Sequence, residues 1–143
     1  QKTILFDYMT QHFGDLKGKT IAFWGLSFKP RTDDVREAPS LYMIEKLKSA
    51  GARVIAYDPV AADNAKLASK HDFEIGSNAY SITEGADALA IITEWNEFRT
   101  PNFKRLKENL KSKVIFDGRN VLDPHQVREE GFEYFCIGRQ TVS

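Results

Sequence analysis

The stretch TIAFWGLSFKPRTDDVREAPS, residues 20–40, changes from a nearly continuous apolar run to a loop that is dense in charge. An apolar run without alternation predicts a strand that is covered on both faces, as in a parallel sheet. The loop behind it carries three cations and three acids, which are Lys29, Arg31, Arg36, Asp33, Asp34 and Glu37. A plain connection between a strand and a helix does not require this mixture, so the loop is a candidate binding site.

Apolar runs of the same kind recur along the chain and alternate with helical patterns. The predicted strands are 53–58, 73–76, 88–93, 113–118 and 133–138, and the predicted helices are 40–51, 61–70, 103–111 and 124–130. Alternation of strands and helices with short links indicates layers joined by right-handed crossovers. We therefore predict an α/β fold: a Rossmann-like, doubly wound, mostly parallel sheet of about six strands with helices on both faces.

A further helix is predicted ahead of the first strand. Its apolar stripe at helical spacing consists of Ile4, Leu5, Tyr8, Met9 and Phe13. This helix either packs at the edge of the sheet or continues from an upstream domain. We expect residues 1–15 to be the end of a helix from a missing central domain, and 16–143 to be the α/β domain. The first residue is Gln and not Met, which suggests a piece of a longer protein.

Composition limits the classes of partner. The chain has 143 residues, of which 42% are hydrophobic, and this suits one domain with one sizeable core. Its formal net charge is zero, so no global field attracts nucleic acid or an anionic membrane, and any anion site is local. A single cysteine excludes an internal disulfide and fits a reducing compartment. No apolar run approaches the roughly 20 residues of a membrane span, so we expect a cytoplasmic protein.

The glycine-rich phosphate loop of dinucleotide-binding sheets is not found after the first predicted strand. Gly25 is followed by Leu26, Ser27 and Phe28, and no second or third glycine comes next. Asp58 ends the second predicted strand, where an acid can bind a ribose. It lies 33 residues after Gly25, whereas about 20 are expected. The sequence YDP fits a turn better, since Asp and Pro readily initiate turns.

Charged side chains stand where that glycine motif would be. Lys29 and Arg36 follow the first predicted strand, and Arg119 follows the fifth. Because ligands of doubly wound sheets lie beyond the carboxyl ends of the strands, these cations predict a local site for phosphate or carboxylate. Phe28 is placed to lie against a planar base.

Purely structural roles for these cations remain open, because charged clusters in loops are often only solvated surface. The pairs would then be Arg36 with Asp33 or Glu37, and Arg119 with Asp117 or Asp123.

Five motifs in order resemble the C-terminal, UDP-binding domain of the UDP-glucose 6-dehydrogenase family, within the wider group of UDP-glucose/GDP-mannose dehydrogenases. They are GKTIAFWGLSFKPRTDDVREAPS (18–40), YDP (57–59), TEWNEFR (93–99), FDGRNVLD (116–123) and GFEYFCIGR (131–139). The resemblance implies an intact enzyme that oxidises UDP-glucose to UDP-glucuronate in two NAD-dependent steps. It also implies an N-terminal domain that binds most of the NAD, a helical central domain, and a homodimer.

The resemblance assigns roles to residues that the charge pattern had already selected. Phe28 and Lys29 match residues that hold the nucleotide-sugar. Arg119 matches the arginine that binds UDP, and Arg36 matches the arginine on the NAD side of the cleft. These are three substrate-binding residues and one cofactor-binding residue, and no catalytic residue is assigned.

Other parts of the family pattern are missing, so this chain is expected to be inactive alone. The nucleophilic cysteine of the family lies in a central domain, whereas Cys136 falls in an apolar strand and is predicted to be an inert core residue. The histidines have no metal-ligand spacing, so no metal is predicted. Thr93, Glu94 and Trp95 are expected to support the architecture. The alternatives are a GDP-mannose or UDP-amino-sugar dehydrogenase, a stand-alone nucleotide-binding module, or a structural dimerisation domain.

Overall fold

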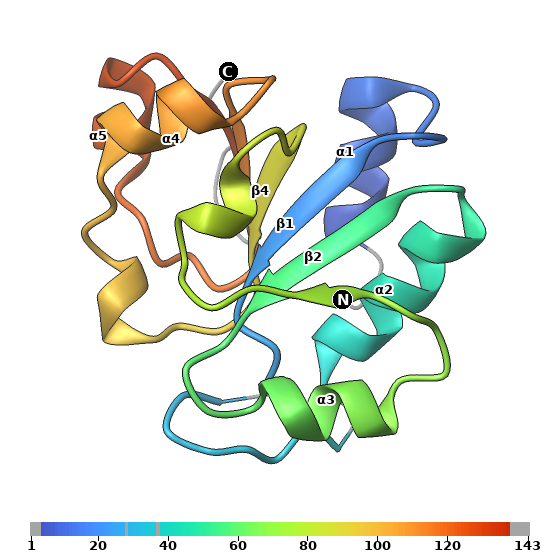
Figure 1. Ribbon diagram of the computed structural model, residues 1–143. Coiled ribbons are helices and arrows are strands. Elements are labelled where there is room, and N and C mark those ends of the chain that lie inside the picture. Colours follow the sequence, from blue (N-terminus) through green and yellow to red (C-terminus); the bar gives the residue numbers. More distant parts are fainter. Residues whose placement is uncertain (1–3, 28, 37, 138–143) are drawn as a thin grey trace.

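The computed structural model describes residues 4–27, 29–36 and 38–137, and Figure 1 shows them as a twisted sheet between two layers of helices. Within these residues six strands pair, all in parallel, in the order β3-β2-β1-β4-β5-β6. The strands are β1 (Thr20–Trp24), β2 (Arg53–Tyr57), β3 (Glu74–Ile75), β4 (Ala88–Ile91), β5 (Val114–Asp117) and β6 (Glu133–Cys136). This is the strand order of doubly wound nucleotide-binding sheets, so the predicted fold class is confirmed.

Helices cover both faces of the sheet, as predicted (Figure 1). One face carries α1 (Ile4–Phe13), α2 (Pro39–Ser49) and α3 (Ala62–Ala68). The opposite face carries α4 (Phe103–Asn109) and α5 (Pro124–Glu129), with the short 3-10 turns η1 (Ser81–Thr83) and η2 (Asn96–Phe98).

Alternate residues of the central strand enter two separate cores, which explains the continuous apolar run. Ile21 and Phe23 of β1 pack under the first helical layer, and Ala22 and Trp24 pack under the second. The ring of Trp24 stacks on Phe98 with centroids 5.0 Å apart. Its Nε1 donates a hydrogen bond to the carbonyl oxygen of Ala79 at 2.8 Å. Burying each large apolar side chain contributes about 1.5–3 kcal/mol, and together these contacts hold β1 at the centre of the sheet.

The predicted first helix is present and packs on the face of the sheet over β5 and β6, beside α2. Leu5 and Met9 supply its buried contacts. The contact is close, because a Cβ at Gly118 would come within 2.8 Å of Leu5 Cδ1. At the far end of the chain, Cys136 is fully buried, as predicted for a core residue. No helix in the described ranges is long and apolar enough to cross a membrane.

Candidate functional site

The direction of winding reverses between β1 and β4. Strands β2 and β3 lie on one side of β1, and the later strands β4, β5 and β6 continue on the other side. In sheets of this kind the crevice for ligands opens beyond the carboxyl ends of the strands at this reversal. The loops after β1, β4 and β5 all leave this edge, and the loop after β1 runs along the bottom of Figure 1 near α3. The predicted site residues stand on these loops.

Asp58 fixes the beginning of the loop after β1. One carboxylate oxygen, Oδ2, accepts hydrogen bonds from the backbone N–H groups of Leu26 at 2.7 Å and Ser27 at 3.3 Å. The other, Oδ1, accepts from Val60 at 2.8 Å and Ala61 at 2.7 Å. Asp58 is buried, and both its oxygens are engaged with backbone. The interpretation of YDP as a turn is therefore confirmed.

Thr93 ties the same loop to the end of β4. Its Oγ1 donates to the carbonyl oxygen of Ser27 at 2.7 Å, and its backbone N–H donates to Trp24 at 3.3 Å. On the opposite side, Ser40 Oγ donates to the carbonyl oxygen of Leu26. The expected architectural role of Thr93 is thus explained by a buried hydrogen bond between two loops of the crevice.

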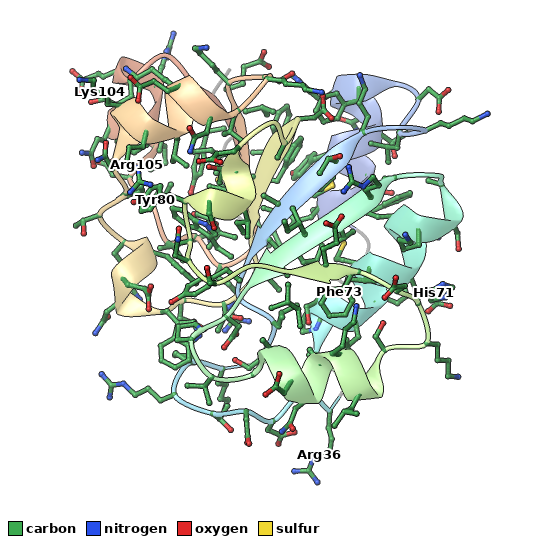
Figure 2. The ribbon with its side chains drawn as sticks, in the orientation of Figure 1. Arg36, His71, Phe73, Tyr80, Lys104 and Arg105 are labelled. Atoms are coloured by element: carbon green, nitrogen blue, oxygen red, sulfur yellow. The ribbon has the colours of Figure 1, made fainter. Side chains whose placement is uncertain are left out.

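Arg36 lies on the loop after β1 and extends away from the body of the protein (Figure 2). Its Nε and Nη2 donate to the two carboxylate oxygens of Asp34 at 3.0 and 2.9 Å. For a purely structural role, we had predicted that Arg36 pairs with Asp33 or Glu37. The prediction of Asp33 was wrong, because it is Asp34 that faces the guanidinium fork. Glu37 lies outside the described residues. The side-chain and backbone hydrogen bonds from Arg36 lower the pKa of Asp34 to about 2.

We expect a pH titration followed by NMR to show the Asp34 carboxylate losing its charge only near pH 2. Arg36→Ala removes the largest cause of the shift, so the pKa of Asp34 should return toward 3.8. Because folding lowers the pKa of Asp34, the pair stabilises the folded state at pH values above 3.8, the ordinary pKa of an aspartate. This contribution is lost as the pH falls toward 2. Asp72 is the internal control, because Lys66 lowers its pKa and Arg36→Ala leaves that contact intact. An unchanged Asp34 titration in Arg36→Ala contradicts this account.

Arg119 is positioned by two acids, one at the end of β5 and one in the loop after β4. Its backbone N–H donates to Asp117 Oδ1 at 3.0 Å, and its Nη2 donates to Glu94 Oε2 at 2.9 Å. The side chains of Arg119 and Glu94 are each 28% exposed, so the pair is neither a free surface contact nor fully desolvated. The sequence had suggested Asp117 or Asp123 as the ion-pair partner, and the ion pair that the structure shows is with Glu94. Sequence reasoning expected Glu94 to support the architecture but did not pair it with Arg119. Its place in the loop after β4, the neighbour of β5, was the available signal.

Lys29 lies two residues after Ser27, and the Oγ of Ser27 donates a hydrogen bond to the Lys29 carbonyl oxygen at 2.6 Å. Phe28 lies outside the described residues. Lys29, Arg36 and Arg119 are thus all on loops at the carboxyl edge of the sheet. Glu94 links these loops, because it binds Arg119 and also lines a hollow together with residues of the loop after β1.

Comparisons with known proteins agree with this geometry. Residues 22–124 match the UDP-glucose/GDP-mannose dehydrogenase family, UDP binding domain. The chain is 43% identical over 147 residues to a UDP-glucose 6-dehydrogenase of Pseudomonas aeruginosa, and this alignment covers 97% of this chain and 32% of that protein. It is 44% identical over 126 residues to a UDP-glucose 6-dehydrogenase of Rhizobium meliloti, and this alignment covers 88% of this chain and 29% of that protein.

Solved structures give the same result. A UDP-glucose dehydrogenase from Pyrobaculum islandicum aligns with a TM-score of 0.78 and 26% identity, over 94% of this chain and 28% of that chain. An NDP-N-acetyl-D-galactosaminuronic acid dehydrogenase from Methanosarcina mazei aligns with a TM-score of 0.80 and 27% identity, over 97% of this chain and 29% of that chain. The chain therefore spans about a third of the length of the relatives that it matches.

Proposed function

The chain belongs to the UDP-glucose/GDP-mannose dehydrogenase family, as its UDP binding domain, and from this premise we propose that it is the nucleotide-sugar-binding part of an NAD-dependent UDP-glucose 6-dehydrogenase. The observation that carries the proposal is the group of cations on the loops after β1 and β5, at the edge where doubly wound sheets bind ligands. The names of the similar proteins from Pseudomonas aeruginosa and Rhizobium meliloti favour UDP-glucose over other nucleotide-sugars.

In this proposal Lys29 supplies a compact ammonium for the phosphates and Arg119 supplies a planar fork. Glu94 and the Asp117 loop hold Arg119 in place before the ligand arrives, so less side-chain entropy is lost on binding. Arg36 exchanges Asp34 for an anionic group of the cofactor when the rest of the enzyme is present. The proposal also assigns Phe28, which is outside the described residues, to the nucleotide-sugar.

NAD itself does not fit a cradle in this sheet. The backbone N–H groups of Leu26 and Ser27, which follow β1 where a pyrophosphate would lie, donate instead to Asp58. Gly25 is the only glycine of that turn. We therefore place most of the NAD contacts, and the nucleophile for the two oxidations of the sugar, in other domains of the intact homodimeric enzyme.

Loss of either nucleotide-binding cation should weaken UDP binding. Each charge-assisted hydrogen bond contributes about 1.5–3 kcal/mol, so Lys29→Ala or Arg119→Ala should raise the dissociation constant for UDP about 10- to 100-fold. An NMR titration of the chain with UDP measures this change. Lys111→Ala and Arg128→Ala are matched controls, because both side chains are exposed next to the starts of β5 and β6, at the opposite edge of the sheet.

Unchanged UDP binding in both site variants would favour a structural dimerisation domain instead. For the whole enzyme, absorbance of NADH during incubation with UDP-glucose is the direct assay of the longer gene product. If the absorbance of NADH rises with GDP-mannose or a UDP-amino-sugar and does not rise with UDP-glucose, the choice of UDP-glucose as substrate is overturned.

A further inference from the structure

A hollow of about 370 Å³ opens between the loop after β1 and the loop after β4, at the point where the winding reverses. The loop after β1 contributes Pro30 and Arg31 to its wall. The loop after β4 contributes Glu94 and Trp95, and the η2 region contributes Arg99. None of these residues has a ligand-binding role in the function proposed above.

The acids that line the hollow bond to residues other than its two arginines. Glu94 Oε2 accepts from Arg119 at 2.9 Å, and Glu97 Oε2 accepts from the hydroxyl of Tyr57 at 3.2 Å. Burial raises the pKa of Tyr57, and the charge of Glu97 raises it further, so the phenol keeps its proton and remains a donor at neutral pH.

The two arginines of the wall differ from Arg36 and Arg119 in their partners. Arg36 and Arg119 each face a carboxylate. Arg31 and Arg99 form no ion pair within the described parts of the chain. Both are exposed, so their guanidinium groups can donate to a ligand that enters the hollow.

The backbone at Arg31 supports a functional reason for its side chain. Its φ is +63°, in the left-handed region that glycine adopts without penalty and that Asn or Asp adopts more readily than other residues. A long cationic residue is therefore held in a conformation that disfavours it. Such positions are concentrated at ligand sites.

Two polar atoms in the same wall lack partners. Trp95 Nε1 and Glu94 Oε1 are buried and make no hydrogen bond in the described structure. Buried polar groups are nearly always paired, so each requires an explanation. One is a donor and the other an acceptor, which fits an occupant that carries an anionic group beside a hydroxyl. Because both atoms are covered, an occupant reaches them only when side chains of the wall rotate.

We propose that this hollow binds the phosphate-bearing part of UDP, with Arg31 and Arg99 donating to the phosphate oxygens. The proposal rests on the nucleotide-binding function above and extends its site from Arg119, through Glu94, to the loop after β1. A guanidinium fork matches phosphate geometry in two parallel hydrogen bonds. A ribose hydroxyl is the group that can donate to Glu94 Oε1, while Trp95 Nε1 donates to an oxygen of the ligand.

The test is an NMR titration of Arg31→Gly and Arg99→Gln with UDP, with NAD⁺ as a second probe. We expect each variant to bind UDP about tenfold more weakly than the unaltered chain. Arg31→Gly should unfold at the same urea concentration or a higher one, because glycine suits φ +63°. Weaker binding together with undiminished stability is a combination that a purely structural arginine does not produce. Arg128→Gln, with the same loss of charge near the opposite edge, should bind as the unaltered chain does.

The outcomes separate this inference from the function on which it rests. If Lys29→Ala and Arg119→Ala weaken UDP binding while Arg31→Gly and Arg99→Gln do not, the hollow is not part of the site and the inference alone fails. If the unaltered chain shows no UDP binding, both fail. If Arg31→Gly weakens only NAD⁺ binding, the hollow serves the dinucleotide and its assignment to UDP is overturned.

Discussion

Asp117→Ala is expected to lower the free energy of unfolding by about 4 kcal/mol, near the cost of breaking a buried charged network. Asp117 is fully buried at the end of β5. Its oxygens accept from the backbone N–H groups of Arg119 at 3.0 Å, Val121 at 2.7 Å and Leu122 at 3.0 Å, and from the hydroxyl of Tyr134 at 2.6 Å. Alanine removes this acceptor from all four donors at once, and each buried donor that finds no other partner costs about 1–3 kcal/mol. The Tyr134 hydroxyl keeps the carbonyl oxygen of Leu122, at 3.2 Å, as a second acceptor.

Urea denaturation measures the loss, and Asp123→Ala is the matched control. Asp123 is an exposed N-cap of α5, and its side chain accepts one hydrogen bond, from His125 N at 3.1 Å. Its replacement should cost about 1 kcal/mol, the usual value for a helix cap. If both variants lose only about 1 kcal/mol, water replaces the Asp117 carboxylate and the buried network is not what holds this loop. The loop carries Arg119, so Asp117→Ala should also weaken UDP binding.

The elements of the fold could be predicted because each strand is a short apolar run that both helical layers cover. β1, β2, β4, β5 and β6 all lie inside the runs that predicted them, and they end one or two residues earlier. The runs overshoot because apolar residues such as Leu26 and Ile92 stay buried after the strand pairing has ended. β3 was the weakest pattern and is a two-residue edge strand whose residues are both exposed, so it carries little apolar signal.

The partners of the charged residues were harder to predict than their positions. Parallel strands place the residues that follow them at one edge, and this is enough to bring Lys29 and Arg119 to the same edge. Glu94 meets Arg119 because β4 and β5 are neighbours in the sheet, although the two residues are 25 apart in sequence. The sequence alone does not fix that adjacency, and it therefore favoured the nearby acids Asp117 and Asp123 over Glu94.

The roles of acids at strand ends were also hard to predict from sequence. Asp58 and Asp117 each occupy the last position of a predicted apolar run or the one before it, where an acid can serve a ligand or a turn. In the structure both carboxylates are buried and accept backbone N–H groups of loops at this edge of the sheet. Burial distinguishes the two roles, and burial depends on the helices packed around the edge. Local sequence does not contain that information.

Gly25→Ala is expected to have an effect as large as that of Asp117→Ala, because two independent penalties meet at Gly25. Its φ is +100°, which disfavours any side chain by roughly 1–2 kcal/mol. A Cβ there would lie 2.4 Å from both Cβ and Oγ1 of Thr93 and 2.7 Å from the Thr93 backbone nitrogen. Overpacking of this kind typically costs 1–3 kcal/mol, so the total should be about 4 kcal/mol in urea denaturation.

Gly131→Ala separates the two penalties, because Gly131 has a similar φ of +89° and nothing within 4 Å of the added Cβ. It should lose only the conformational part, about 1–2 kcal/mol. The clash at Gly25 also pushes on Thr93, whose Oγ1 bonds to Ser27, so the loop that carries Lys29 should shift and UDP affinity should fall. Gly131 lies at the opposite edge of the sheet, before β6, and its variant should bind UDP normally. Equal losses of stability in the two variants, with UDP affinity unchanged in both, would mean that Thr93 does not hold the loop after β1 in place.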